Sequence, residues 1–228
     1  MPGRSAAAGD VCWPAAAEQA FGARLPLARR YADLLTTRGI EHGLLGPREA
    51  ERIWERHLLN CAALTDLLPN GARVVDVGSG AGLPGLVLAI RRPDLRVELV
   101  ESLRRRTDFL TEAVSELGLT ESVRVIRGRA EDPAVIAEAG SARWVTARAV
   151  APIDRLVRWC LPLLDQDGCL LAMKGRSAAE ELRTHRDVIR RAGGRDLRVV
   201  QCQVTGTDEA ISVIVVRRAE TRSRRGSS

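Results

Sequence analysis

The sequence has few aromatic residues and no long apolar run. Tryptophan, tyrosine and phenylalanine make up 3% of the 228 residues, so stacking of bases on exposed rings is not a general binding strategy here. A typical apolar run, residues 86–90, is far shorter than the roughly 18 residues that cross a bilayer. Asp10 interrupts the first residues before the apolar core of a secretory signal forms. We therefore expect a cytoplasmic protein with no membrane segment.

Cysteine is scarce, and its spacing argues against two classes of site. The chain has five cysteines, an odd number, and none of them forms a C-x-x-C pair. This pattern argues against a disulfide framework and against a zinc ribbon. His57 and Cys61 lie four residues apart on a helical pattern, but two ligands are too few for a metal. We expect core packing for both and no metal site.

Lysine is almost absent although the chain is basic. The formal net charge is +6, which points weakly to a polyanionic partner. Lys174 is the single lysine among the 35 basic residues, so a compact ammonium at that position stands out. A hydrophobic content of 45% with 28% charged residues is normal for a soluble globular protein and excludes global disorder.

The chain divides into a helical N-terminal part and a part in which strands and helices alternate. We expect a mobile leader over residues 1–14, a helical extension over 15–70, a larger domain over 71–217 and a disordered basic tail over 218–228. Gly39 is expected to end the first long helix of the extension.

From residue 73 onward, short β-branched runs alternate with helical patterns, which indicates an α/β fold with a mostly parallel sheet. Strands are expected at 73–77, 96–100, 123–127, 144–147 and 169–173. Helices are expected at 84–91, 104–117, 133–138, 153–164 and 178–192. Two last strand-like runs, 197–204 and 210–216, have only five residues between them. Five residues cannot carry a crossover, so this pair must be antiparallel.

The most informative segment is Val74–Gly85, which reads Val-Val-Asp-Val-Gly-Ser-Gly-Ala-Gly-Leu-Pro-Gly. A strand leads into a glycine-rich turn and then into a helix. Glycines let the backbone approach a ligand closely, and the start of a helix presents unpaired N–H groups. Gly80, Gly82 and Gly85 match the G-x-G-x-x-G dinucleotide pattern, but that pattern alone is weak, and Gly80 lies too far into the turn.

Two carboxylates at strand ends bear on the choice of cofactor. Asp76 lies two residues before Gly78, where a carboxylate would repel a pyrophosphate and suit the ammonium and sulfonium of S-adenosylmethionine. Glu101 ends the second strand and can accept hydrogen bonds from both hydroxyls of a ribose, in S-adenosylmethionine or in NAD. The antiparallel last strand favours a methyltransferase over a dinucleotide fold. Alternatively, Asp76 and Glu101 are only capping or solvated carboxylates.

Residues 76–85 resemble the signature of the bacterial 16S ribosomal RNA guanine-N7 methyltransferase family, of the glucose-inhibited division protein B type. Segments 55–61, 146–152 and 172–175 are similar to the family in the same order, and the resemblance extends over residues 18–216. It implies a class I S-adenosylmethionine-dependent methyltransferase fold, Rossmann-like, with a small N-terminal helical extension. It also implies 16S ribosomal RNA, or the assembling small ribosomal subunit, as the substrate of what we expect to be a monomer.

The candidate cofactor-binding residues come from two sources, the residue types and their spacing, and the resemblance to the family. The residues themselves indicate Asp76, Gly80, Gly82 and Glu101. The resemblance implies contacts from Gly78, Leu83, Ala130, Glu131 and Arg148.

Guanine N7 has a free lone pair and no proton to remove, so its methylation needs no general base. Catalysis then comes from holding the base and the methyl group together. We expect Lys174 and Arg148 to orient the base, because each follows a strand at the cofactor end of the sheet. Alternatively, Lys174 is only a surface lysine and Arg148 only forms a structural ion pair. The basic cluster 104–106 either follows phosphates or is a solvated helix start.

Three other functions remain open from the sequence. They are a small-molecule methyltransferase on the same fold, a non-catalytic RNA-binding or ribosome-assembly factor that retains the fold, and an NAD-linked oxidoreductase.

Overall fold

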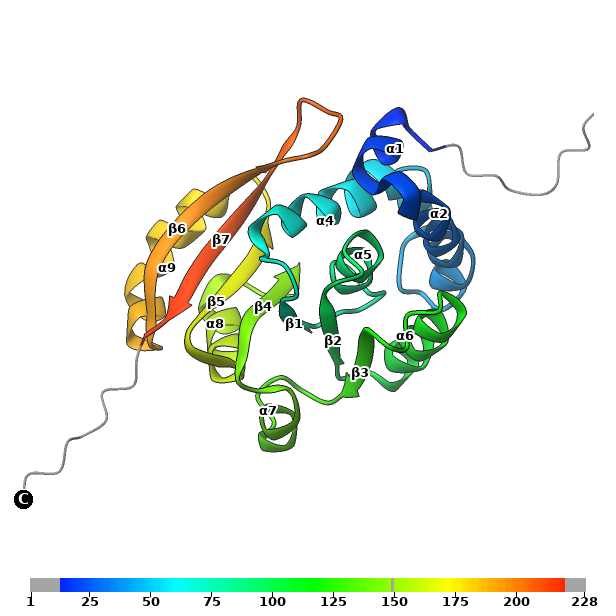
Figure 1. Ribbon diagram of the computed structural model, residues 1–228. Helices are drawn as coiled ribbons and strands as arrows, with labels where there is room; N and C mark the ends of the chain where they lie inside the picture. Colours follow the sequence, from blue (N-terminus) through cyan, green and yellow to red (C-terminus); the bar gives the residue numbers. More distant parts are fainter. Residues whose placement is uncertain (1–12, 149, 220–228) are drawn as a thin grey trace, which may run out of the picture.

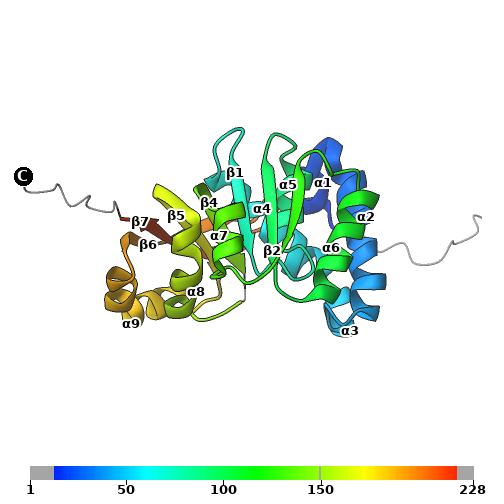
Figure 2. The same cartoon turned by 90° about the horizontal axis from the view of Figure 1, so that it is seen from below.

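The computed structural model describes residues 13–148 and 150–219. They form a seven-stranded sheet with helices on both faces (Figures 1 and 2). The strand order is β3-β2-β1-β4-β5-β7-β6. The strands are β1 (Arg73–Val77), β2 (Arg96–Glu101), β3 (Val123–Arg127), β4 (Ala142–Arg148), β5 (Leu164–Lys174), β6 (Gly194–Gln203) and β7 (Ala210–Arg218).

The first five strands are parallel, β7 runs in the opposite direction, and β6 returns to the direction of the first five. β1 pairs with both β2 and β4 in parallel, and β5 pairs with β7 antiparallel. β6 and β7 form the antiparallel hairpin that the five-residue connection predicts. The predicted α/β sheet with an antiparallel last pair is therefore confirmed.

Nine α-helices are described, besides short 3₁₀ and π segments. They are α1 (Ala15–Phe21), α2 (Leu25–Leu34), α3 (Pro47–Ala50), α4 (Leu59–Ala63), α5 (Gly85–Arg91), α6 (Arg104–Glu116), α7 (Pro133–Ala139), α8 (Ile153–Cys160) and α9 (Ala178–Arg191). Within the described residues, none is long and apolar enough to cross a membrane.

Alternating side chains of the strands bury two separate cores. Val74 of β1 belongs to the core formed with α5, α6 and the helical extension. Val75 and Val77 belong to the core formed with α7, α8 and α9. Asp76 therefore shares a face with Val74, on the side that α5 and the extension cover.

The first long helix does not end at Gly39. A π segment, Leu35–Gly39, continues α2, and helical backbone runs on to Glu41. Gly43, with φ +62°, has the left-handed conformation that closes a helix. The helix therefore ends just before Leu44 and Leu45, which line the cavity described below.

The predicted leader and tail lie mostly outside the described residues. The boundary at 218 needs one correction, because Arg218 is the last residue of β7 and pairs with Gly194 of β6. The hydrogen-bonded ladder thus extends one residue into the predicted tail.

Candidate active site

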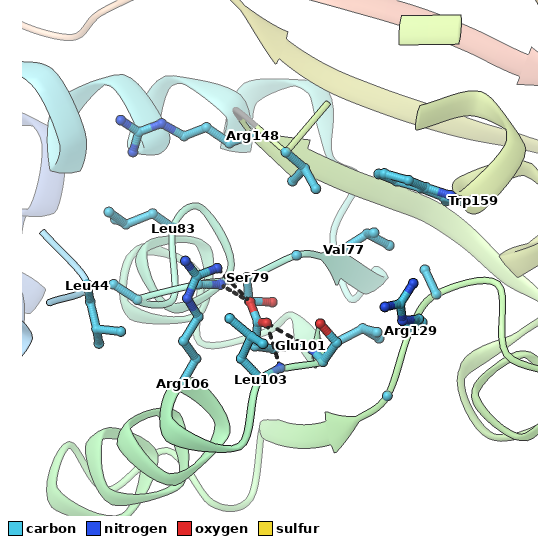
Figure 3. Close-up of a pocket in the computed structure, with 18 of the residues that line it drawn as sticks. Leu44, Val77, Ser79, Leu83, Glu101, Leu103, Arg106, Arg129, Arg148 and Trp159 are labelled. Carbon is cyan, nitrogen blue, oxygen red and sulfur yellow. Dashed lines mark hydrogen bonds and ion pairs between the residues drawn. The ribbon is translucent and has the colours of Figure 1, made fainter. Parts of the chain in front are cut away.

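A cavity of about 590 Å³ opens where β1, β2 and β4 end (Figure 3). Carboxyl ends of parallel strands are the usual ligand site of open α/β sheets. The walls come from the glycine turn, the segments after β2, β3 and β4, the helical extension and α8. The lining includes Leu44, Leu45, His57, Val77, Gly78, Ser79, Gly80, Ala81, Leu83, Val100, Glu101, Ser102, Leu103, Arg106, Gly128, Arg129, Ala130, Glu131, Arg148, Val150 and Trp159.

The glycine turn forms the floor of this cavity. Gly78 has φ +67° and Gly80 has φ +58°, a left-handed conformation in which L side chains are strained. A Cβ on Gly78 would lie 2.7 Å from a methyl carbon of Val150. The turn is also braced from below, because the buried Tyr31 hydroxyl donates to the Ala81 carbonyl at 2.7 Å. The turn therefore offers bare backbone held in a fixed shape.

Glu101 is the buried carboxylate at the centre of the site (Figure 3). Its Oε2 accepts the Gly80 N–H at 3.0 Å. Its Oε1 accepts the N–H groups of Ser102 and Leu103, each at 2.9 Å. Arg106 lies 3.5 Å from Oε2 as an ion pair. The carboxylate thus connects the glycine turn to the segment after β2, and it lines the cavity.

Asp76 lies beneath the glycine turn and does not line the cavity. It is fully buried, its Oδ2 accepts the Gly85 N–H at 3.0 Å, and its Oδ1 accepts the Thr146 hydroxyl at 2.9 Å. The structure places it outside the pocket, against the prediction of direct cofactor contact, because it lies inside β1, level with Leu99 and under the start of α5. Its geometry is that of a positioning residue, which fixes the start of α5 under the turn.

Burial raises the pKa of the Asp76 carboxyl to about 6, from an ordinary value of 3.8, although its hydrogen bonds oppose that shift. A raised pKa in the folded state means that the folded protein binds this proton more tightly. Its contribution to stability is therefore present below about pH 4 and is lost as the pH rises to about 6.

We expect Asp76→Asn to remove this pH dependence. Asparagine can accept the Gly85 N–H and donate to Thr146, and it carries no charge to desolvate. The free energy of unfolding of the variant minus that of the native chain should rise between pH 4 and pH 6. A pKa shift of about two units corresponds to a rise of about 3 kcal/mol. Denaturant titrations of both proteins at pH 4, 5, 6 and 7 measure the difference, and a constant difference would contradict the role of burial.

The far end of the cavity follows β2 and β3. Ala130 and Glu131, for which cofactor contacts are expected, line it. Leu103 and Val150, the exposed large apolar side chains of the described residues, both lie at its rim. Trp159, which is only partly buried, also lines it. Apolar groups around a carboxylate suit an adenosine, whose base is flat and whose ribose carries hydroxyl donors.

Arg148 lines the cavity from β4, and its guanidinium points toward the helical extension (Figure 3). It lies 2.5 Å from His57 Nδ1, donates to the Arg56 carbonyl at 3.3 Å and contacts Cys61 Sγ at 3.4 Å. A guanidinium only donates, so Nδ1 must accept and Nε2 must carry the proton. His57 Nε2 then donates to Glu49 at 2.6 Å.

His57 therefore has a role that the sequence analysis missed when it assigned this residue to core packing. Burial, and then the nearby Arg148 charge, lower the pKa of His57, which favours the neutral ring that can accept from Arg148. No sequence signal separates this histidine from a core histidine, because its partners are 8 and 91 residues away. Within the described residues, no group of three or more metal-ligating side chains occurs.

Lys174 does not line the main cavity. Its Nζ donates to the Ala151 carbonyl at 2.8 Å and pairs with Glu181 at 2.9 Å. The same Glu181 oxygen accepts the Ile153 N–H at 2.7 Å. Lys174 lines an adjoining hollow that shares Val150 with the main cavity. The lysine and Glu181 thus hold the segment after β4 in place.

The structure brings together most, but not all, of the predicted site residues. Those that line the cavity are Gly78, Gly80, Leu83, Glu101, Ala130, Glu131 and Arg148. Asp76, Gly82 and Lys174 do not. A Cβ on Gly82 would lie 2.5 Å from the Leu86 side chain and 2.8 Å from the Tyr31 hydroxyl, so Gly82 serves the packing behind the turn.

The donor and acceptor set fits S-adenosylmethionine. The bare glycine backbone at Gly78 leaves room that a Cβ would fill, Glu101 offers carboxylate oxygens, and the rim is apolar. With the parallel sheet and the reversed last strand, these features define a class I S-adenosylmethionine-dependent methyltransferase.

Solved structures support this class at the level of the fold. A crystal structure of the S-adenosylmethionine-dependent methyltransferase SibL has a TM-score of 0.59 at 18% identity, and the match covers 89% of this chain and 72% of that one. An S-adenosylmethionine-dependent O-methyltransferase from Thermotoga maritima has a TM-score of 0.54 at 14% identity, covering 72% and 66%.

Sequence comparison identifies the family. Residues 24–211 match the family described as "rRNA small subunit methyltransferase G". A "Ribosomal RNA small subunit methyltransferase G" of Salinispora arenicola (strain CNS-205) is 56% identical over 221 residues, covering 96% of this chain and 91% of that protein. One of the same name from Mycobacterium marinum (strain ATCC BAA-535 / M) is 52% identical over 207 residues, covering 91% and 90%. The chain belongs to this family, as its glycine turn predicts.

Proposed function

We propose that the chain transfers a methyl group from S-adenosylmethionine to N7 of one guanine in 16S ribosomal RNA. Family membership carries this proposal. Exposed arginines with no hydrogen-bond or ion-pair partner among the described residues add support, because they lie close along the chain to residues that line the cavity or the adjoining hollow. They are Arg48, Arg52, Arg105, Arg127, Arg155, Arg158 and Arg176. Such cations suit RNA phosphates, and a small neutral substrate would not need them.

The cofactor supplies a methyl group on a sulfonium centre. The protein's own residues do the positioning. Glu101 and the glycine turn would hold the adenosine end, and Ala130 and Glu131 would face its adenine base. Leu103, Val150 and Trp159 would exclude water from the mouth of the cavity. Arg148 lines the cavity, is fixed by His57, and would donate to O6 of a guanine bound there. Since N7 carries no proton, holding it near the methyl group is the main catalytic effect, worth up to about 7–11 kcal/mol in favourable cases.

Lys174 acts in this proposal by positioning the segment after β4. We expect Lys174→Ala to reduce turnover about tenfold, because the Ala151 carbonyl loses its donor and Glu181 is left as a part-buried charge without its partner. Affinity for S-adenosylhomocysteine should change less than about twofold, since Lys174 does not line that cavity. Turnover assays and calorimetry measure the two effects. Arg96→Ala, an exposed cation where β2 begins, should change neither, and native turnover in the Lys174 variant would remove it from the site.

The direct test of the reaction is transfer of a labelled methyl group to RNA, followed by mass mapping of the product. Two substrates are compared, deproteinised 16S ribosomal RNA and isolated small ribosomal subunits, both lacking the modification. The expected product is one N7-methylguanine in at least one of them. Cofactor binding without transfer to either would favour an assembly factor that retains the fold. Binding of NAD without binding of S-adenosylhomocysteine would favour an oxidoreductase and refute the proposal.

The proposal also includes the oligomeric state and the cellular compartment of the enzyme. We propose that the working form is a monomer. A ribosomal RNA substrate places that work in the cytoplasm. Sedimentation equilibrium should give a mass near 24.8 kDa, and activity that tracks a dimer would contradict this part of the proposal.

A further inference from the structure

A second hollow, of about 510 Å³, lies at the β6 edge of the sheet and shares no residue with the cofactor cavity. Figure 1 shows α9 and β6 together at this edge, on the opposite side of the molecule from α2 and α6. Four arginines and one aspartate line it, with Gly194 and Leu197. These charged residues are Arg186, Arg190, Arg195, Arg198 and Asp196. We call this set the edge patch.

The single carboxylate of the edge patch already has cationic partners. Asp196 lies 3.9 Å from Arg195 and 3.6 Å from Arg217, and Arg195 pairs in addition with Asp167. In contrast, Arg186, Arg190 and Arg198 are exposed and have no hydrogen-bond or ion-pair partner among the described residues. The edge patch therefore presents three uncompensated positive charges to solvent.

The fold places these cations close together although their like charges repel one another. Arg186 and Arg190 are four residues apart on α9, where like charges destabilise a helix by about 0.2–0.5 kcal/mol. In a regular strand, residues three apart face opposite sides, but β6 has a register shift between Arg195 and Arg198, and Asp196 there has φ +50°. Both arginines consequently line the same hollow.

Protection of a free sheet edge explains only part of this arrangement. β6 is the last strand in the sheet of the described residues, and charges or bulges on such a strand prevent pairing with another chain. Protection of the sheet edge accounts for Arg198 and for the register shift in β6. It does not cover Arg186 and Arg190, which are on α9 and not on the exposed strand.

We propose that the edge patch binds the phosphate backbone of the substrate RNA away from the methylated base; this inference rests on the proposed function. A guanidinium suits phosphate because its planar fork donates two parallel hydrogen bonds. Glu181 and Arg190 are nine residues apart on α9, which corresponds to about 14 Å along the helix axis. The edge patch thus lies outside the cofactor cavity, and its role is to position the RNA.

The test compares a triple variant, Arg186→Gln, Arg190→Gln and Arg198→Gln, with a control of equal charge. The control replaces Arg30, Arg38 and Arg96 by glutamine, on α2, the π segment that follows it and β2. Affinity for deproteinised 16S ribosomal RNA is measured by filter binding over a series of salt concentrations. Loss of three phosphate contacts should reduce the slope of log affinity against log salt by about 2 to 3, and should weaken binding at least tenfold near 0.15 M salt. The control should reduce the slope by less than 1.

Two further readouts separate this inference from the proposed function. The edge-patch variant should bind S-adenosylhomocysteine like the native chain and reach native turnover at saturating RNA, with a higher KM. If the native chain transfers no methyl group to RNA or subunits, the proposed function fails, while the slope still reports RNA binding. If the native chain is active and the edge-patch variant keeps its slope and KM, the edge-patch inference is wrong. A native slope on naked RNA with a raised KM on subunits alone would indicate a ribosomal protein partner and also overturn it.

Discussion

Gly78→Asp should abolish detectable cofactor binding. Gly78 is the first residue after β1 and lines the floor of the cavity at φ +67°. A side chain there meets Val150 at 2.7 and 2.9 Å, and a carboxylate fills the space above the turn close to Glu101. Overpacking combined with an unpaired charge costs at least about 3 kcal/mol, which corresponds to a loss of affinity of about 100-fold or more. Calorimetry with S-adenosylhomocysteine measures this loss.

The chain offers a matched control for backbone strain. Gly118 has φ +66°, almost the same as Gly78, but a Cβ there has nothing within 4 Å. Gly118→Asp should therefore reduce the melting temperature slightly, since aspartate tolerates the left-handed conformation, and should leave cofactor affinity unchanged. If Gly78→Asp binds the cofactor as Gly118→Asp does, the glycine turn is not the cofactor floor.

The strands and the sheet topology were predictable because their signals are local. Short β-branched runs, helix periods and the five-residue connection each depend on neighbours in the chain. The first helix was less predictable. A glycine after a helical pattern is typical of a helix end, but at Gly39 a π segment continues the helix. The helix ends near Gly43, whose positive φ cannot be read from the sequence.

The site was predictable where it depends on the glycine turn and was not where it depends on how far along a strand a side chain lies. Asp76 pairs with Leu99, two residues before Glu101, so both carboxylates are on one face of the sheet. Asp76 lies under the start of α5, whereas Glu101 is at the end of β2 and lines the cavity. Asp76 does not line the cavity, so it cannot exclude a pyrophosphate from it, and Glu101 suits the ribose of either cofactor. The reversed strand β7 and the family match therefore carry the choice of S-adenosylmethionine. His57 could not be assigned from sequence, since its partner Arg148 is 91 residues away.

Glu101→Gln should reduce affinity for S-adenosylhomocysteine by about 30- to 150-fold. The carboxylate accepts backbone N–H groups at both oxygens, from Gly80 on one side and from Ser102 and Leu103 on the other. Glutamine has one oxygen, so its amide N–H must face a backbone N–H on one of these sides. The ribose also loses a charged acceptor. Hydrogen bonds to charged groups contribute about 1.5–3 kcal/mol each, and a net loss of about 2–3 kcal/mol gives the expected range.

Glu98→Gln separates loss of binding from loss of stability, because Glu98 is on the same strand and outside the cavity. Its carboxylate accepts from Arg73 at 2.7 Å and lies 3.4 Å from Arg124. Both variants should unfold at lower denaturant concentration, since each loses a charged acceptor with several donors. Only Glu101→Gln should lose cofactor affinity. Equal affinities in the two variants, at equal stability, would mean that Glu101 braces the turn without contacting the ribose, and that the neutral glutamine braces it equally well.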